Sequence, residues 1–166
     1  MFQLTAQQSK IAHLNVRKEK HGQEEVTAVD IKVEVDVPND FLSYLNSTLK
    51  SDLYGKYDNA AQGDLVPDPG YLPRLKHPEI KHIKWTGEMK KAQVIIHGAT
   101  KKASIAFDAD VNKLVLECKD GGTVSISFRV QVIPEANLKS KLLDMLGVET
   151  KVTVAAADVD LGDGGE

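Results

Sequence analysis

The sequence predicts an α+β domain, with a mainly antiparallel sheet that curls toward a sandwich or a barrel and with two amphipathic helices. Several segments alternate between apolar and polar residues, which is the pattern of a strand with one buried face. Two of these segments end at a proline and are followed by apolar residues at helical spacing. The chain has 166 residues, of which 42% are hydrophobic and 27% charged, the ordinary composition of one globular domain.

The first strand–proline–helix unit lies in the N-terminal third of the chain. Residues 29–37 alternate valine or isoleucine with charged residues. Pro38 ends this strand, because proline has no backbone N–H to donate to a neighbouring strand. Asn39 or Asp40 can cap a helix, and apolar residues at helical spacing then predict an amphipathic helix over residues 40–53.

A similar unit lies near the C-terminus. Residues 124–132 alternate apolar with polar side chains, and Pro134 ends this strand. Gly147 suits the position that follows the last turn of a helix. The apolar stripe of that helix consists of Leu138, Leu142, Met145 and Leu146. Residues 151–155 predict a last short strand.

Further strands are expected in the middle of the chain, at residues 93–97, 103–107 and 113–118. Asp108-Ala109-Asp110 has the composition of a hairpin connection between the second and third of these strands. Lys119-Asp120-Gly121-Gly122 then predicts the turn into the strand at 124–132. Successive hairpins of this kind favour an antiparallel sheet, with the two helices covering its apolar face.

We expect one globular domain over residues 1–154. Residues 11–18 and 26–37 are expected to pair as a hairpin with a long connection. Residues 55–78 are rich in proline and glycine and predict a long irregular loop. Residues 155–166 contain three glycines, four acids and no basic residue, and predict a disordered acidic tail.

The net charge of −3 is the sum of unlike parts. Besides the acidic tail, the chain contains a basic stretch at residues 72–102, where Glu79 and Glu88 are the only acidic residues and Trp85 is the only tryptophan of the chain. The basic residues of this stretch are Arg74, Lys76, Lys81, Lys84, Lys90, Lys91, Lys101 and Lys102.

A basic stretch with an embedded aromatic ring is typical of proteins that bind single-stranded nucleic acid. Lysines displace phosphate counterions, and a base can stack on the ring. Trp85 is the expected stacking residue, and the expected phosphate contacts are Arg74, Lys81, Lys84, Lys90, Lys91, Lys101 and Lys102. The alternative is a solvated basic face with a tryptophan that belongs to the core.

The acidic tail has two possible uses. It can compete with nucleic acid for the basic groove, or it can bind a basic partner such as a host or phage protein. The candidate partner-binding residues of the tail are Asp158, Asp160, Asp163 and Glu166.

Recognisable catalytic motifs are absent from the sequence. It contains no phosphate-binding loop, no dinucleotide fingerprint, no nucleophile elbow and no zinc-protease signature. Cys118 is the only cysteine, which excludes an intrachain disulfide and a cysteine-based zinc site. We therefore expect a protein that is not an enzyme and needs no cofactor, although a nuclease built from dispersed acids is an alternative.

Two patterns come close to a metal site and fail. His77 and His82 are five residues apart with a proline between them, which fits no helical pairing of ligands. The Asp-rich segment from Asp108 begins like a calcium loop. Lys113 stands where that loop needs glycine, and Lys119 stands where it needs the bidentate glutamate. No metal site is expected.

The chain has no signal-peptide pattern at its N-terminus and no apolar run of the roughly 18–20 residues that cross a bilayer. Together with the single cysteine, this favours a soluble protein of a reducing, cytoplasmic compartment without a membrane partner.

Part of the sequence resembles small uncharacterised proteins that bacteriophages and prophages encode. The resemblance lies in Leu14-Asn15-Val16-Arg17-Lys18-Glu19-Lys20-His21-Gly22, in residues 26–32 and in residues 49–54, and it covers about residues 10–54. Such proteins are often encoded beside phage recombination or replication genes. The resemblance implies the cytoplasm of a bacterial host and a small accessory role, and it transfers no catalytic residue.

Three functional hypotheses follow. The leading one is a non-enzymatic phage accessory protein that binds single-stranded DNA or supports phage DNA recombination or replication. The second is a phage-encoded inhibitor that binds a host defence protein through the 55–78 loop and the tail. The third is a virion structural protein. The sequence leaves the oligomeric state open.

Overall fold

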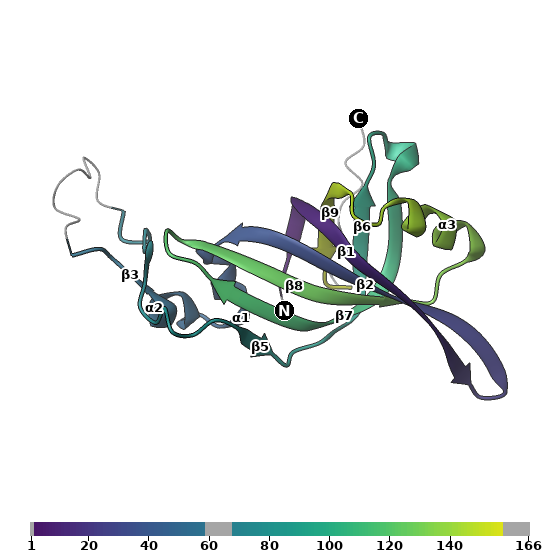
Figure 1. Ribbon diagram of the computed structural model, residues 1–166, viewed down its shortest axis with the longest axis horizontal. Helices are drawn as coiled ribbons and strands as arrows, with labels where there is room; N and C mark the ends of the chain where they lie inside the picture. Colours follow the sequence, from purple (N-terminus) through teal and green to yellow (C-terminus); the bar gives the residue numbers. More distant parts are fainter. Residues whose placement is uncertain (1, 59–67, 158–166) are drawn as a thin grey trace.

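The computed structural model describes residues 2–58 and 68–157, and it confirms the α+β class with a mainly antiparallel sheet. In this part of the chain, six long strands close into a barrel (Figure 1). These strands are β1 (Leu4–His21), β2 (Glu24–Pro38), β6 (Met89–His97), β7 (Ile105–Cys118), β8 (Thr123–Val132) and β9 (Glu149–Ala155).

The remaining elements are short, apart from one helix of nine residues, and they lie in the connections. The longest connection, between β2 and β6, carries η1 (Asn39–Phe41), α1 (Leu42–Leu45), α2 (Leu49–Leu53), β3 (Tyr54–Gly55), β4 (Arg74–Leu75) and β5 (Ile83–Trp85). The other connections carry η2 (Lys101–Ala103) and α3 (Ala136–Asp144).

The barrel closes because β7 pairs with β8, which lies at the far end of the strand order β7-β6-β9-β1-β2-β8. All of these pairs are antiparallel. The other edge of β7 pairs first with β6 and then, at Leu114–Leu116, with β5. The short strand β5 therefore occupies the part of this β7 edge that β6 does not reach.

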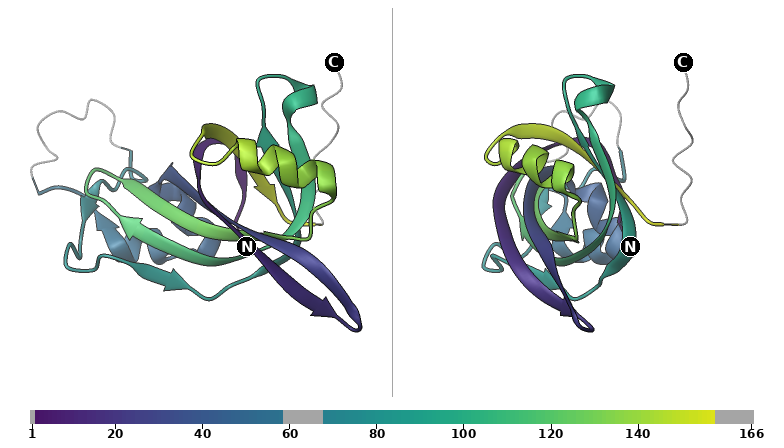
Figure 2. Two further views of the ribbon diagram at one scale, coloured as in Figure 1. Left: turned by 45° about the vertical axis from the view of Figure 1, so that its right-hand side comes forward. Right: turned by 90° about the vertical axis from the view of Figure 1, so that its right-hand side faces the viewer.

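The alternating apolar residues fill the barrel interior, as a closed antiparallel sheet requires. Along β2, Ile31 and every second residue to Val37 are buried, whereas the residues between them are exposed. The two ends of the barrel are closed differently. At the end of the barrel where α1 lies, the Phe2 ring packs against Phe41 and Phe128 at centroid distances of 5.3 and 5.4 Å. At the other end α3 covers the opening and buries Leu142 (Figures 1 and 2).

The first hairpin extends beyond the barrel. Residues 17–28, here called the arm, pair only with each other in the described structure, because β2 pairs with β8 from Val29 onward. The arm projects freely from the barrel (Figures 1 and 2). His21 lies opposite Glu24, so the connection has two residues and is not the long connection expected from the sequence. Gly22 has a φ of 68°, which a tight turn of this kind requires and glycine adopts easily.

The expected hairpin at Asp108–Asp110 is wrong. These residues lie inside β7, and the β6–β7 hairpin turns instead at Gly98–Ser104. Asp108 is exposed on the outer face, and Asp110 accepts a hydrogen bond from the backbone N–H of Lys91 on the neighbouring strand. Because Ala109 between them is buried, the segment follows the normal alternation of a strand. The prediction failed because aspartates are common in turns, whereas here they occupy the solvated face of a strand.

The expected continuous helix over residues 40–53 is also wrong. The structure has η1 and two helical turns, with extended backbone at Asn46 (φ −158°, ψ 139°). The Asn46 side-chain oxygen accepts hydrogen bonds from the backbone N–H and the hydroxyl of Thr48, at 2.9 and 3.0 Å. Such local bonds compete with the helical ones, so the polar run 46–48 divides the helix. The second expected helix is confirmed as α3, and Gly147 beyond it has a φ of 76°.

The remaining expectations about chain organisation concern the long loop and the tail. Within the long loop predicted at residues 55–78, the described ends pair with each other as β3 and β4, and residues 59–67 lie outside the described structure. The last strand runs through Ala155, so the predicted tail begins inside β9. Among the described residues, no helix combines the length and apolar character needed to cross a bilayer.

Candidate nucleic-acid interface

The first half of the basic stretch forms an irregular segment along one side of the barrel, residues 74–84, here called the strap, with a turn in its middle where the Ile80 N–H donates to the His77 carbonyl at 3.0 Å. Its first end is anchored because β4 pairs with β3 and the Lys76 N–H donates to the Leu53 carbonyl at 2.9 Å. The Lys76 ammonium donates to the Ser51 carbonyl at 2.6 Å. Its second end is anchored by the pairing of β5 with β7. The strap is therefore held at both ends with its middle on the surface.

The β7–β8 turn fixes the beginning of the strap. One Asp120 carboxylate oxygen accepts from the Leu75 N–H at 3.0 Å, and the other accepts from the Tyr57 hydroxyl at 2.8 Å. The hydrogen bond from the Leu75 N–H is the main reason why the pKa of Asp120 lies below its ordinary value. The Gly121 N–H donates to the Pro73 carbonyl at 2.8 Å.

Buried groups reinforce this anchor. The Tyr54 ring is fully buried, and its hydroxyl donates toward the carbonyls of Lys119 and Thr123, at 2.9 and 3.2 Å. Burial is the main cause that raises the pKa of Tyr54, so the phenol stays protonated as a donor. The buried Asn39 amide donates to the Leu72 carbonyl at 2.7 Å. The Asn39 N–H donates to the Gly122 carbonyl at 2.8 Å, so the β7–β8 turn is bonded to the connection both before and after residues 59–67.

The strap carries four basic residues against Glu79, and from Lys76 to His82 all of its side chains are exposed. Its charged residues and histidines are Arg74, Lys76, His77, Glu79, Lys81, His82 and Lys84. Arg74 donates through Nε to the Lys56 carbonyl at 2.8 Å, which leaves the rest of its guanidinium for another acceptor. The strap is thus an exposed basic edge whose backbone position is fixed.

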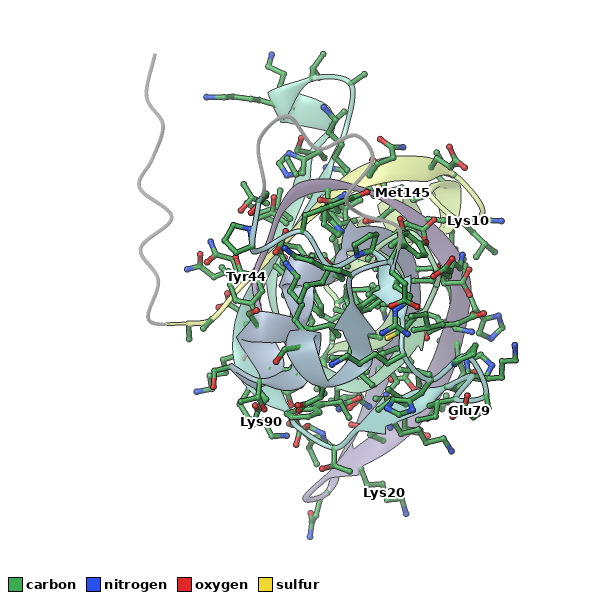
Figure 3. All side chains as sticks on the ribbon, turned by 90° about the vertical axis from the view of Figure 1, so that its left-hand side faces the viewer. Lys10, Lys20, Tyr44, Glu79, Lys90 and Met145 are labelled. Carbon is green, nitrogen blue, oxygen red and sulfur yellow. The ribbon has the colours of Figure 1, made fainter. Side chains whose placement is uncertain are left out.

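An open groove of about 850 Å³ lies beside the strap on the outer face of the barrel. Lys84 and His82 line its strap side, and Lys10 lines it from β1. Figure 3 shows Lys10 and the strap residue Glu79 on the same side of the molecule. The remaining polar residues that line the groove are Gln7, Gln8, Ser9, Lys32, Glu34, Asp36, Glu117, Ser125, Ser127 and Glu149.

The groove itself is rich in hydrogen-bonding groups but is not basic. Its carboxylates outnumber its lysines, and Lys32 already forms an ion pair with Glu34 at 3.3 Å. The Ser125 hydroxyl contacts the Asp36 carboxylate. A polyanion would therefore be attracted to the strap and not to the groove floor, where serines, amides and carboxylates offer donors and acceptors to neutral polar groups.

The predicted phosphate contacts do not lie together. Lys90 and Lys91 lie at a bulge in β6, and Figure 3 shows Lys90 on the side of the barrel opposite Glu79. The Lys90 ammonium forms ion pairs with Glu88 and Asp110, at 2.9 and 3.1 Å. Its charge is balanced locally, unlike that of the strap lysines.

Lys101 and Lys102 lie in η2 at the tip of the β6–β7 hairpin, which rises at the other end of the barrel from β5 (Figure 1). About nine residues of β7 separate that tip from the β5 contact, a distance of roughly 30 Å in a strand. The basic stretch of the sequence is therefore three separate basic groups in the structure. Of the predicted phosphate contacts, Arg74, Lys81 and Lys84 lie on the strap, where Lys76 is the fourth basic residue.

Trp85 is partly buried against the core and not presented as an open platform. It lines a small cavity of about 70 Å³ together with Phe2, Met89 and Leu114. Gly87 lies against its indole edge, since a side chain there would begin 2.7 Å from the indole nitrogen. Of the tyrosines, Tyr44, Tyr57 and Tyr71 are more exposed than Trp85, with 53%, 42% and 56% of their surface accessible.

A polar network that sequence reasoning missed crosses the outer faces of β1, β2, β8 and β7. The Arg17 guanidinium donates to both carboxylate oxygens of Asp30, at 3.0 and 3.2 Å, and Gln131 donates to Asp30 at 3.1 Å. Arg129 donates to Asn112 at 2.8 Å. Burial is the largest single influence on Asp30 and raises its pKa, but these donors together outweigh it and leave the pKa below its ordinary value. The alternating sequence of residues 29–37 predicted that Asp30 faces outward, but it gave no sign of these partners.

The groups considered for metal binding or nucleophilic chemistry do not converge. Among the described residues, no three His, Cys, Asp or Glu side chains are placed to hold a metal ion. His77 and His82 are exposed on the strap, whereas a ring nitrogen of His97 contacts the Thr153 hydroxyl at 2.7 Å. Cys118 is half-buried, and burial raises the pKa of its thiol, which disfavours the nucleophilic thiolate.

The four acids predicted to bind a partner, Asp158, Asp160, Asp163 and Glu166, lie outside the described residues. Comparisons of the chain with protein-family models, with curated proteins and with solved structures found no match. The strap and its groove are therefore interpreted from their own chemistry.

Proposed function

We propose that this protein is a non-enzymatic accessory protein that binds single-stranded nucleic acid along the strap. The observation that carries the proposal is the exposed basic edge of residues 74–84, which is anchored at both ends beside an open polar groove. Lys81, Lys84 and Arg74 contact phosphates. Lys76, whose ammonium is held by the Ser51 carbonyl, adds positive charge to the same edge. Binding of this kind is driven by the release of phosphate counterions.

The bases face the groove, where neutral polar groups meet matching donors and acceptors. Carboxylates such as Glu117 accept from exocyclic amines, and the hydroxyls of Ser125 and Ser127 serve as donor or acceptor. Double-stranded DNA hides these base edges within its grooves, so the arrangement favours single strands. Stacking contributes little unless Tyr57 or Tyr71 takes part, because Trp85 packs against the core.

A role in phage DNA recombination or replication completes the proposal, and its support is the sequence resemblance of residues 10–54. The competing hypothesis of a host-protein inhibitor depends on the tail and the 55–78 loop. No contact of the described residues favours it.

The test is fluorescence anisotropy with a labelled oligothymidine at about 50 and 200 mM salt. We expect binding at the lower concentration that weakens steeply at the higher one. The variant Lys81→Glu/Lys84→Glu should weaken binding at least about tenfold and reduce the salt dependence, since each lost phosphate contact lowers the slope by roughly 0.7.

The matched control is Lys101→Glu/Lys102→Glu, which makes the same change of net charge at the far hairpin. We expect it to change the affinity less than about threefold, because it lies more than a Debye length from the strap. Equal losses in the two variants would mean that only net charge matters, and the strap would then not be the binding site. Absence of binding by the unchanged protein at the lower salt concentration would exclude the proposed function.

A further inference from the structure

We propose that two copies of this chain associate through the free edge of β1, which joins the two β1–β2 hairpins into one four-stranded antiparallel ribbon. In the described structure, β9 pairs with β1 only as far as Lys10, whereas β1 continues to His21 with β2 as its strand partner. Residues 12–20 of β1 therefore have one edge without a neighbouring strand. A free edge of this length is a template for pairing with another chain.

The free edge has defined limits. At its start, Ile11 is occupied on that side, because its N–H donates to the Val148 carbonyl at 3.4 Å and its carbonyl accepts from the Gly147 N–H at 2.8 Å. At its end, the chain turns at Gly22. An antiparallel partner must fit between these limits, and residues 12–20 of a second copy do so when Val16 lies opposite Val16 of that copy. In that register Ala12 lies opposite Lys20.

The side chains support this register. Val16 is 57% exposed, which is costly for a valine on its own and favourable opposite a second valine. On either side of it, Asn15 lies opposite Arg17 and His13 lies opposite Glu19, so no two like charges face each other. Moving the centre of the pairing to Arg17 or Lys18 would place identical cations opposite each other, which destabilises a strand pair.

Exposed apolar residues lie where the second arm would end. Leu146 and Val148 have 48% and 47% of their surface accessible, and the Val148 carbonyl accepts a hydrogen bond from the Ile11 N–H at the start of the free edge. In the proposed register the tip of the second arm, around His21, reaches Ile11 and covers these side chains. The symmetry applies to both copies, so each chain contributes the same surface. The two barrels then lie at opposite ends of the ribbon, consistent with arms that project from the barrel (Figure 2).

Charged residues on a free edge normally prevent pairing with arbitrary strands. Lys18 and Lys20 serve that purpose here, and in the proposed register they lie opposite the uncharged residues Leu14 and Ala12 of the second copy. The partner is therefore a second copy and not an unrelated extended segment.

Disulfide trapping tests the register directly. Opposed residues of antiparallel strands have Cα atoms about 4.5–5.5 Å apart, within the range that a disulfide spans. With Cys118→Ser as background, Val16→Cys should give a rapidly formed covalent dimer when diamide oxidises the two thiols. Lys20→Cys is the matched control on the same strand: its two thiols would lie roughly 27 Å apart, so this variant should form no covalent dimer. A mixture of Ala12→Cys and Lys20→Cys chains should form a mixed dimer.

Sedimentation of the unchanged chain supplies the second measurement. We expect a dimer at micromolar concentration that Val16→Lys weakens at least about tenfold, since it places two cations at the symmetry axis. Thr5→Lys is the control, an exposed site on a part of β1 that is already next to β9. A monomer throughout the micromolar range, or equal trapping of Val16→Cys and Lys20→Cys, would overturn the proposal.

Discussion

The two ends of the barrel are closed by different kinds of interaction. At the strap end, hydrogen bonds tie an irregular connection to the β7–β8 turn: the Tyr54 hydroxyl and the Asn39 N–H donate to carbonyls of the turn, and Asp120 accepts from the Leu75 N–H. At the other end a single helix inserts Leu142, and the arm extends past it with a free edge. Directional bonds fix an exposed backbone segment in place, whereas apolar contact closes an opening without ordering what projects beyond it. The first end is suited to present charges, and the second to meet another chain.

The largest expected effect on stability is at the α3 end. Leu142→Ala removes a side chain that is 1% exposed and should lower the free energy of unfolding by about 3 kcal/mol, because a cavity replaces the plug of the barrel. Chemical denaturation measures this loss. Nucleic-acid affinity of the folded variant should stay unchanged, since the strap is anchored elsewhere. A loss of affinity in the folded protein would contradict the separation of the two ends.

An intermediate effect is expected on the barrel wall between the two ends. Asp30→Asn leaves Arg17 and Arg129 without their shared carboxylate and should cost about 2 kcal/mol at neutral pH. The pKa of Asp30 is lower in the folded than in the unfolded protein. Its contribution is therefore fully present above the unfolded value and is lost as the pH falls through the folded value.

The pH profile provides the check on this interpretation. Between about pH 5 and pH 2, the unchanged protein should lose stability more steeply than Asp30→Asn, so the two stability curves should approach each other. Parallel curves over that interval would show that the carboxylate does not stabilise the wall through its charge.

A smaller effect is expected at the strap end. Tyr54→Phe keeps the buried ring but removes the hydroxyl that donates toward the carbonyls of Lys119 and Thr123, and it should cost about 1 kcal/mol. Hydrogen exchange of the amides of Leu75 and Lys76 should become faster, while exchange in β9 should not change. Unaltered exchange at both strap amides would mean that this anchor does not hold the strap.

The smallest effect concerns Trp85. Because its ring packs against the core beside Gly87, Trp85→Phe should change the affinity for oligothymidine less than about twofold, although it can lower stability. Anisotropy titration of the folded variant measures this. A tenfold loss of affinity would restore base stacking on Trp85 as a part of the interface.

The sequence predicted the fold class and most of the strands, because alternation reports directly which residues face a common interior. It did not predict the continuity of β7, since Asp108 and Asp110 on a solvated strand face have the composition of a turn. It also did not divide the helix at Asn46, where a side chain competes with the backbone for hydrogen bonds. Both errors arose where local composition and long-range pairing disagreed.

The candidate site was predictable only in part. The sequence identified an excess of lysine over residues 72–102, but the distribution of these lysines depends on strand order. Lys84 and Lys101 are close in sequence and lie at opposite ends of the barrel because β6 runs between them. The ion pairs of Lys90 with Glu88 and Asp110 likewise depend on register across two strands. Neither fact has a signal in a single sequence.

The most direct test of the central claim is to map where nucleic acid touches the protein. An oligothymidine that contains 4-thiothymidine is bound at about 50 mM salt, cross-linked by light and located by mass spectrometry of the peptides. The account predicts adducts in residues 74–84 and in the groove strands near Lys10 or Lys32, and none at Lys101 or Lys102. Adducts confined to residues 90–102, or no adduct at a saturating oligonucleotide concentration, would contradict it.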